Sequence, residues 1–82
     1  PTAHNLRGVA LAALGRLGEA AEAFGAAAER APDDGGPRFN RGLALAKLRR
    51  WEEALAAYDD AVRLLPDDPA AWLHRGYARL EL

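Results

Sequence analysis

In this 82-residue chain, the paired aspartates are the first candidates for a chemical role. Adjacent carboxylates serve general acid–base catalysis and bind hard metal ions. Asp33–Asp34 and Asp67–Asp68, however, both follow a proline and stand 34 positions apart. A pair that recurs with the period of the whole chain is explained by turn formation and helix capping. The stretch PDDGGP also lacks the alternating oxygen ligands of a calcium loop, so no calcium site is expected.

Nucleophilic catalysis and metal binding lack their usual residue types. The chain has no serine and no cysteine, and Lys47 is its one lysine. His4 and His74 belong to separate helices, too far apart to share a metal ion. We therefore predict no catalytic residue, no cofactor and no metal site, and a protein that is not an enzyme. One alternative stays open, in which these residues are the substrate-docking arm of a larger enzyme.

The overall charge and hydropathy also narrow the class of partner. A formal net charge of −1 gives no general attraction to nucleic acids or to anionic membranes. No apolar run approaches the ~20 residues that are needed to cross a bilayer. Neither a nucleic acid nor a membrane is therefore predicted as a partner. With 50% hydrophobic residues, the chain suffices for one small domain, residues 1–82.

The elements that position these residues follow from an internal repeat. A shift of 34 residues aligns residues 1–34 with residues 35–68, and 14 aligned positions are identical. Gly8, Gly42 and Gly76 occupy one column of this alignment. A third unit covers residues 69–82, so the chain holds two full units and the first half of another.

Each full unit predicts two short helices joined by a turn. The expected helices span about Thr2–Leu14, Gly18–Ala31, Pro37–Leu48, Glu52–Leu65 and Ala70–Leu82. Gly35–Gly36 is expected to be a loop, because Pro37 suits the first turn of a helix. Asp68 is expected to cap the last helix. Helices of this length are marginal alone, so their stability must come from packing.

Small residues recur where the two helices of a unit are expected to cross. The absence of bulk at Gly42 and Ala54 should let the two backbones approach closely. Tyr58, like Phe24 in the first unit, should then fill the space beside the crossing. This packing would offset the roughly 1 kcal/mol that a glycine costs inside a helix.

This combination resembles the tetratricopeptide repeat family over the whole chain. The residues that carry the resemblance are Gly8/Gly42/Gly76, Ala20/Ala54, Phe24/Tyr58, Ala27/Ala61, Pro32/Pro66 and Trp72. The resemblance implies an all-α fold, namely a right-handed α-solenoid of antiparallel helix pairs with five helices. It also implies a protein–protein interaction or scaffold module as the function.

Two columns depart from the family's pattern. His4 and Arg38 stand where the family favours tryptophan, and Arg7, Arg41 and Arg75 stand where it favours leucine. We expect these three arginines to lay their stems over the neighbouring helix, with the guanidinium groups in water.

In this family the first helices of successive units line a concave groove that receives an extended peptide or a partner helix. The resemblance and the helical spacing assign to this groove Asn5, Val9, Phe39, Asn40, Leu43, Lys47, Leu73, His74 and Tyr77. The expected apolar anchors form an uncovered patch of Phe39, Leu43, Leu73 and Tyr77. Asn5, Asn40 and His74 are expected to form hydrogen bonds with the peptide backbone.

The best-defined ligand of the family, an acidic C-terminal tail held by a two-carboxylate clamp, is not expected here. Only Asn40 matches the clamp, and no lysine or arginine stands at its other positions to pair with a terminal carboxylate. Self-association is the alternative to binding a foreign peptide. Stacking onto another copy would cover the last helix, which carries Trp72, Tyr77, Leu80 and Leu82.

Overall fold

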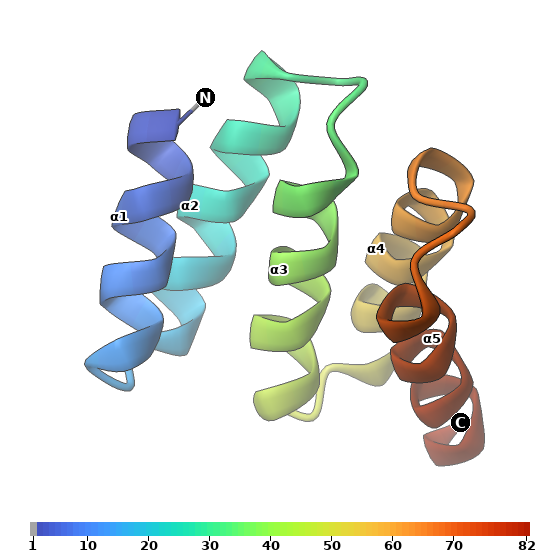
Figure 1. Ribbon diagram of the computed structural model, residues 1–82. Coiled ribbons are helices and arrows are strands. Elements are labelled where there is room, and N and C mark those ends of the chain that lie inside the picture. The colour runs from blue at the N-terminus through green and yellow to red at the C-terminus, as the bar shows by residue number, and fades with distance from the viewer. Residues whose placement is uncertain (1) are drawn as a thin grey trace.

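The computed structural model describes residues 2–82, and within this range every regular element is a helix (Figure 1). Pro1, the first residue of the expected first unit, lies outside the described residues. The helices are α1 (Thr2–Ala13), α2 (Leu17–Arg30), α3 (Gly35–Lys47), α4 (Trp51–Leu64) and α5 (Pro69–Glu81). Each helix packs against the next one along the chain, and α5 also touches α3. The predicted α-solenoid with five helices is confirmed.

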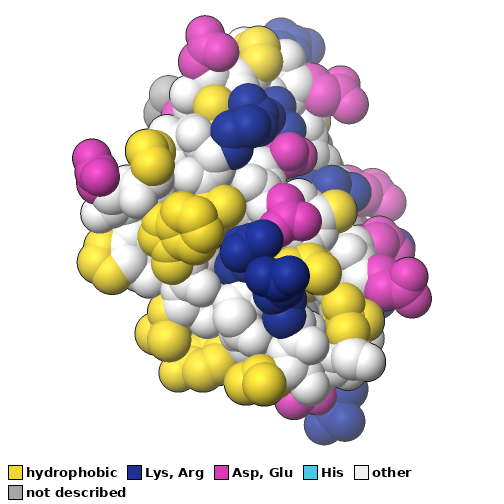
Figure 2. Space-filling view, turned by 90° about the vertical axis from the view of Figure 1, so that its right-hand side faces the viewer, with side chains coloured by type: hydrophobic (Ala, Val, Ile, Leu, Met, Phe, Trp, Pro, Cys, Tyr) yellow, Lys and Arg dark blue, Asp and Glu magenta, His cyan; other side chains and the backbone are white. Residues whose placement is uncertain are grey.

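The core of each helix pair is an aromatic ring placed directly over a glycine. A Cβ atom built on Gly42 would lie 2.4 Å from Cε1 of Tyr58, and one on Gly8 would lie 2.5 Å from Cε1 of Phe24. The expectation that the Tyr58 and Phe24 rings fill the space beside each glycine is confirmed, since the atoms nearest to each missing side chain belong to these rings. The ring fills the space that the glycine leaves. On the side where α4 and α5 lie, apolar side chains remain exposed among arginines and carboxylates (Figure 2).

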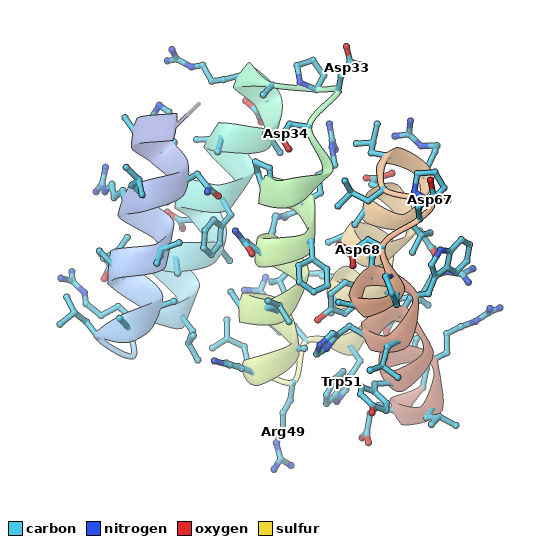
Figure 3. The ribbon with its side chains drawn as sticks, in the orientation of Figure 1. Asp33, Asp34, Arg49, Trp51, Asp67 and Asp68 are labelled. Atoms are coloured by element: carbon cyan, nitrogen blue, oxygen red, sulfur yellow. The ribbon has the colours of Figure 1, made fainter. Side chains whose placement is uncertain are left out.

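The starts of the helices differ from the sequence-based expectation. Gly35 and Gly36 are the first two residues of α3. The Asp34 side chain is the N-cap of this helix, because it accepts a hydrogen bond from the Gly36 N–H at 2.9 Å. Gly35 also packs so closely that a Cβ there would lie 2.5 Å from Cγ of Leu65. The expected cap at Asp68 is confirmed, since its side chain accepts from the Ala70 N–H at 3.0 Å (Figure 3).

The turn inside each helix pair has a left-handed residue at its centre. Gly15 has a φ of 79° and Arg49, 34 positions later, has a φ of 61°. The Arg50 N–H bonds to the Leu45 carbonyl and the Arg49 N–H to the Ala46 carbonyl, both at 2.9 Å. These two bonds form a Schellman motif, in which the left-handed position favours glycine. Because the motif closes so tightly, α4 begins at Trp51, one residue earlier than expected.

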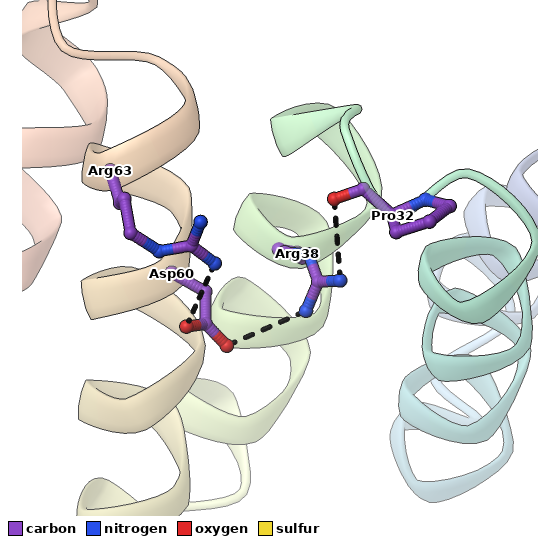
Figure 4. A network of polar contacts seen from close by, with 4 residues as sticks. All are labelled: Pro32, Arg38, Asp60 and Arg63. Atoms are coloured by element: carbon purple, nitrogen blue, oxygen red, sulfur yellow. Dashed lines mark hydrogen bonds and ion pairs between the residues drawn. The ribbon is translucent and has the colours of Figure 1, made fainter.

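Arg38, in the column where tryptophan was expected, joins the end of the first unit to α4. Its guanidinium lies 3.5 Å from the Pro32 carbonyl and 3.5 Å from the Asp60 carboxylate, which also approaches Arg63 (Figure 4). In the column of Arg7, Arg41 and Arg75, the last member pairs with Asp59. The guanidinium of Arg75 thus has an exposed partner on α4, an ion pair that the sequence analysis did not predict.

We predict opposite effects from the same substitution at two glycines of one column. Gly42→Ala should destabilise the fold by about 1–3 kcal/mol, because the new methyl group collides with the Tyr58 ring. Gly76→Ala should stabilise it by about 0.5–1 kcal/mol, because no atom lies within 4 Å of the new Cβ and alanine favours the helix. Urea unfolding of dilute protein measures both. Equal shifts in the two variants would contradict the packing of the Tyr58 ring on Gly42.

We also predict that Arg49→Gly stabilises the protein by about 1 kcal/mol, since the left-handed conformation of Arg49 is strained. The side chain is exposed and points away from the helices (Figure 3), so its removal loses no core contact. The reciprocal variant Gly15→Arg should lose a similar amount. Thermal unfolding of the two variants checks the sign, and a loss of stability in Arg49→Gly would refute the strain.

Candidate functional site: the concave face of α1, α3 and α5

The first group of expected groove residues surrounds an open depression between α1 and α3. Its volume is about 170 Å³. Four of the expected residues line it, namely Val9, Asn40, Leu43 and Lys47. Apolar side chains make up most of the rest of the wall, and Lys47 is the one charged residue among those that line it. The depression therefore suits an apolar group with a negative charge near its edge.

Asn5 and Asn40 lie beside this depression and contact each other. The Asn40 Nδ2 donates to the Asn5 Oδ1 at 3.2 Å, across 35 positions of the sequence. We expected each of these side chains to form hydrogen bonds with the backbone of a peptide. The Asn5 NH2 group and the Asn40 amide carbonyl form no hydrogen bond with any other side chain of residues 3–82. The remaining donor and acceptor are of the kinds that the two polar groups of a peptide unit can bind.

The second group of expected residues forms an aromatic cluster between α3 and α5. His74 is its centre: the ring centroid lies 5.5 Å from that of Phe39 and 5.8 Å from that of Tyr77, both edge to face. Tyr58 of α4 lies beneath, 6.0 Å from His74 and 5.9 Å from Phe39. Such distances are typical of favourable aromatic pairs. The cluster thus connects the outer surface of α5 with the ring that fills the Gly42 position.

The expected anchors differ in exposure. Tyr77 and Leu73 are each 52% exposed, whereas Phe39 and Leu43 are half-buried and pack against the core. The patch is therefore only partly uncovered, because Phe39 packs against both clusters of buried residues. What α1 and α3 present is a shallow apolar wall with exposed rings at its α5 end.

Sequence reasoning missed several residues of this face. Leu17, Phe24 and Ala44 also line the depression. Leu6 is 61% exposed and falls in the same repeat column as Asn40 and His74. The 34-residue period was the signal that could have identified Leu6, since two members of its column had already been assigned to the groove.

Burial raises the pKa of the Tyr58 phenol to about 12. Its hydroxyl is buried and has no hydrogen-bond partner among the described residues. In the unfolded chain a tyrosine ionises near pH 10. The neutral ring therefore contributes stability that is fully present below pH 10 and is lost as the pH rises toward 12.

We predict that Tyr58→Phe removes this alkaline loss. The wild type should lose up to about 3 kcal/mol through this group between pH 10 and pH 12, and the variant should not. At pH 7 the variant should be at least as stable, because a buried hydroxyl without a partner is removed. Denaturant unfolding at pH 7, 10 and 11 measures both effects. Parallel curves for the two proteins would show that Tyr58 is not the titrating group.

Two further features bear on the chemistry of the site. Among residues 2–82, no three histidine, cysteine, aspartate or glutamate side chains gather as a metal ion would require. None of the helices in the described part of the chain is long and apolar enough to cross a membrane.

Comparison with known proteins places this architecture in a family. The model of a family described as tetratricopeptide repeat matches residues 1–34 and 38–68. A comparison with curated proteins gave no match. Tetratricopeptide repeats generally mediate protein–protein interaction and are typically not enzymes. Because the two matches cover most of its length and agree with the two ring-and-glycine helix pairs, this chain belongs to the tetratricopeptide repeat family.

Proposed function

We propose that this chain is a protein-interaction module that binds an extended, mainly apolar peptide segment on its concave face. The observation that supports this most directly is the apolar depression between α1 and α3 beside the Asn5–Asn40 pair. In this proposal the nine groove residues predicted from the sequence act together, and the chain binds its partner without catalysing a reaction on it.

The size of the depression limits the side chain that it receives. A cavity of roughly 150 Å³ holds a benzene molecule. The depression of about 170 Å³ therefore accepts one leucine or phenylalanine side chain of the peptide. Val9 and Leu43 contact it on two sides, and burial of such a side chain contributes roughly 1.5–3 kcal/mol.

Polar groups fix the direction of the peptide. The free N–H of Asn5 donates to a peptide carbonyl, and the free carbonyl of Asn40 accepts from a peptide N–H. Lys47 at the edge of the depression attracts a carboxylate next to the apolar side chain. Tyr77 and Leu73 then contact the part of the peptide that crosses α5.

We predict that peptides selected on the protein from a random library carry one leucine or phenylalanine followed or preceded by an acidic residue. Val9→Glu should weaken their binding by about tenfold or more, because a charge then borders the depression. Asn40→Ala should weaken it by a smaller factor. Isothermal titration with a selected peptide gives the affinities.

The matched control is Leu82→Glu, which adds the same charge to an exposed leucine at the end of the chain. Its affinity for the peptide should equal that of the wild type within about twofold. Circular dichroism confirms that each variant is folded. Selected peptides that bind the Val9→Glu variant as tightly as the wild type, or a library that yields no binder, would contradict the proposed site.

A further inference from the structure

The third glycine of the repeat column has no ring above it. Gly8 and Gly42 are buried under Phe24 and Tyr58, whereas no atom lies within 4 Å of a Cβ built on Gly76. The first two glycines accept their rings from an antiparallel neighbouring helix. Gly76 therefore presents a position of the same shape that no described residue of this chain fills.

Exposed apolar side chains surround this vacant position. Trp72 and Leu80 stand one turn before and one turn after Gly76, and Leu73 stands three residues before it, so all share its side of α5. Their exposed fractions are 47%, 83% and 52%, and Figure 2 shows apolar groups gathered on this side of the molecule. Apolar surface of this kind marks an interaction site.

A further helix of the ordinary repeat type does not match this face. Leu11 and Leu45 occupy one repeat column and are 9% and 1% exposed. The third member of the column is Arg79. A helix that covered α5 as α4 covers α3 would bury this guanidinium, which is unfavourable unless a carboxylate comes with it. The occupant must therefore supply both a ring for Gly76 and an acidic group for Arg79.

We propose that the occupant is α5 of a second copy of this chain, packed antiparallel about a two-fold axis at the level of residue 74. This residue is midway between Trp72 and Gly76, so the axis places each Trp72 opposite the partner's Gly76. Each copy of α5 then provides both a ring and a glycine, so the contact between Trp72 and Gly76 forms twice. Such self-complementarity is what an isologous interface requires.

The same axis brings opposite charges together. Residue 79 lies level with residue 69 of the other copy, because each pair of opposed positions adds up to 148. The long Arg79 side chain can therefore reach the partner's Asp67, which lies in the turn two residues before residue 69. Asp67 and Arg79 are both exposed in the single chain, and neither forms an ion pair with another residue of the described range. Two Arg79–Asp67 pairs would flank the apolar centre.

Trp72 is already arranged for burial. Its Nε1–H donates to the Pro66 carbonyl at 2.8 Å, and the guanidinium of Arg75 lies 5.6 Å from the ring centroid. The pairing of Arg75 with Asp59 holds this guanidinium in place. Because the indole N–H is satisfied within the chain, covering the ring leaves no buried donor without a partner.

Sedimentation equilibrium over about 10 μM to 1 mM protein tests the proposal. A single helix pair buries less than the ~1,600 Å² of a standard interface, so the dimer is expected to be weak. The average mass should rise from 8.8 kDa toward twice that value. Gly76→Gln should weaken association about tenfold or more, because its side chain fills the vacant position. A strict monomer at 1 mM would overturn the proposal.

The matched control is Gly18→Gln, because Gly18 also lies in a helix with no atom within 4 Å of its Cβ. This variant should associate like the wild type. If Gly76→Gln also associates like the wild type, the contact lies elsewhere and the proposal is wrong. A substitution of this kind should leave the single chain folded, as far-ultraviolet circular dichroism of dilute samples would show.

Charge reversal tests the antiparallel orientation. Arg79→Glu and Asp67→Arg should each associate more weakly than the wild type, because each places like charges opposite one another. An equimolar mixture of the two variants should associate again as a heterodimer. The control Arg30→Glu, an exposed arginine in the last turn of α2, should behave like the wild type. A mixture that stays monomeric would rule out the proposed axis.

Discussion

The contact on which the structure depends is an aromatic ring lying on a glycine of the neighbouring helix. Tyr58 over Gly42, and Phe24 over Gly8, replace the interlocking of two large side chains with one ring and one bare backbone. The ring is then almost completely enclosed: Tyr58 is 1% exposed and Phe24 is 3% exposed. Alanines around it, such as Ala20 and Ala54, are fully buried and let the next helix follow at short range. The glycine's unfavourable helix propensity is thereby offset by close packing.

This contact also determines which side chains the proposed binding face presents. Tyr58 reaches from α4 beneath Phe39 and His74, so the outer rings of the face rest on a ring that cannot move without opening the core. An anchor that is held before the ligand arrives loses less conformational entropy on binding. The α1–α3 depression has a similar origin, because its wall includes Phe24, whose ring is fixed over Gly8. The core and the proposed binding surface are therefore two sides of the same aromatic layer.

Local chemistry explains how far the sequence predicts this fold. The period, the number of helices and the cap at Asp68 all follow from residue types at fixed spacing, and they were predicted. The predicted starts of α3 and α4 were wrong by two residues and by one residue, respectively. For α3 the reason is that a glycine pair predicts a loop unless the cap before it is already known. The bond between Asn5 and Asn40 could not be predicted, since it depends on the distance between α1 and α3. The aromatic rings set that distance, and it cannot be predicted from the spacing of residues along one helix.

The column of Arg38 and Trp72 shows why apolar surface is concentrated at α5. Both side chains donate to the carbonyl of the proline six residues earlier, Pro32 for Arg38 and Pro66 for Trp72. The two residues differ in what remains after this bond. Arg38 still carries a charge, its Nε–H is buried without a partner, and it pairs with Asp60, so that position stays polar and is enclosed by α4 (Figure 4). Trp72 has a single N–H, which the bond satisfies, and its ring is left as an apolar surface. Arg38 and Trp72 thus make the same bond to a proline carbonyl. Arg38 leaves a polar contact between helices inside the array, and Trp72 leaves an apolar surface on its last helix.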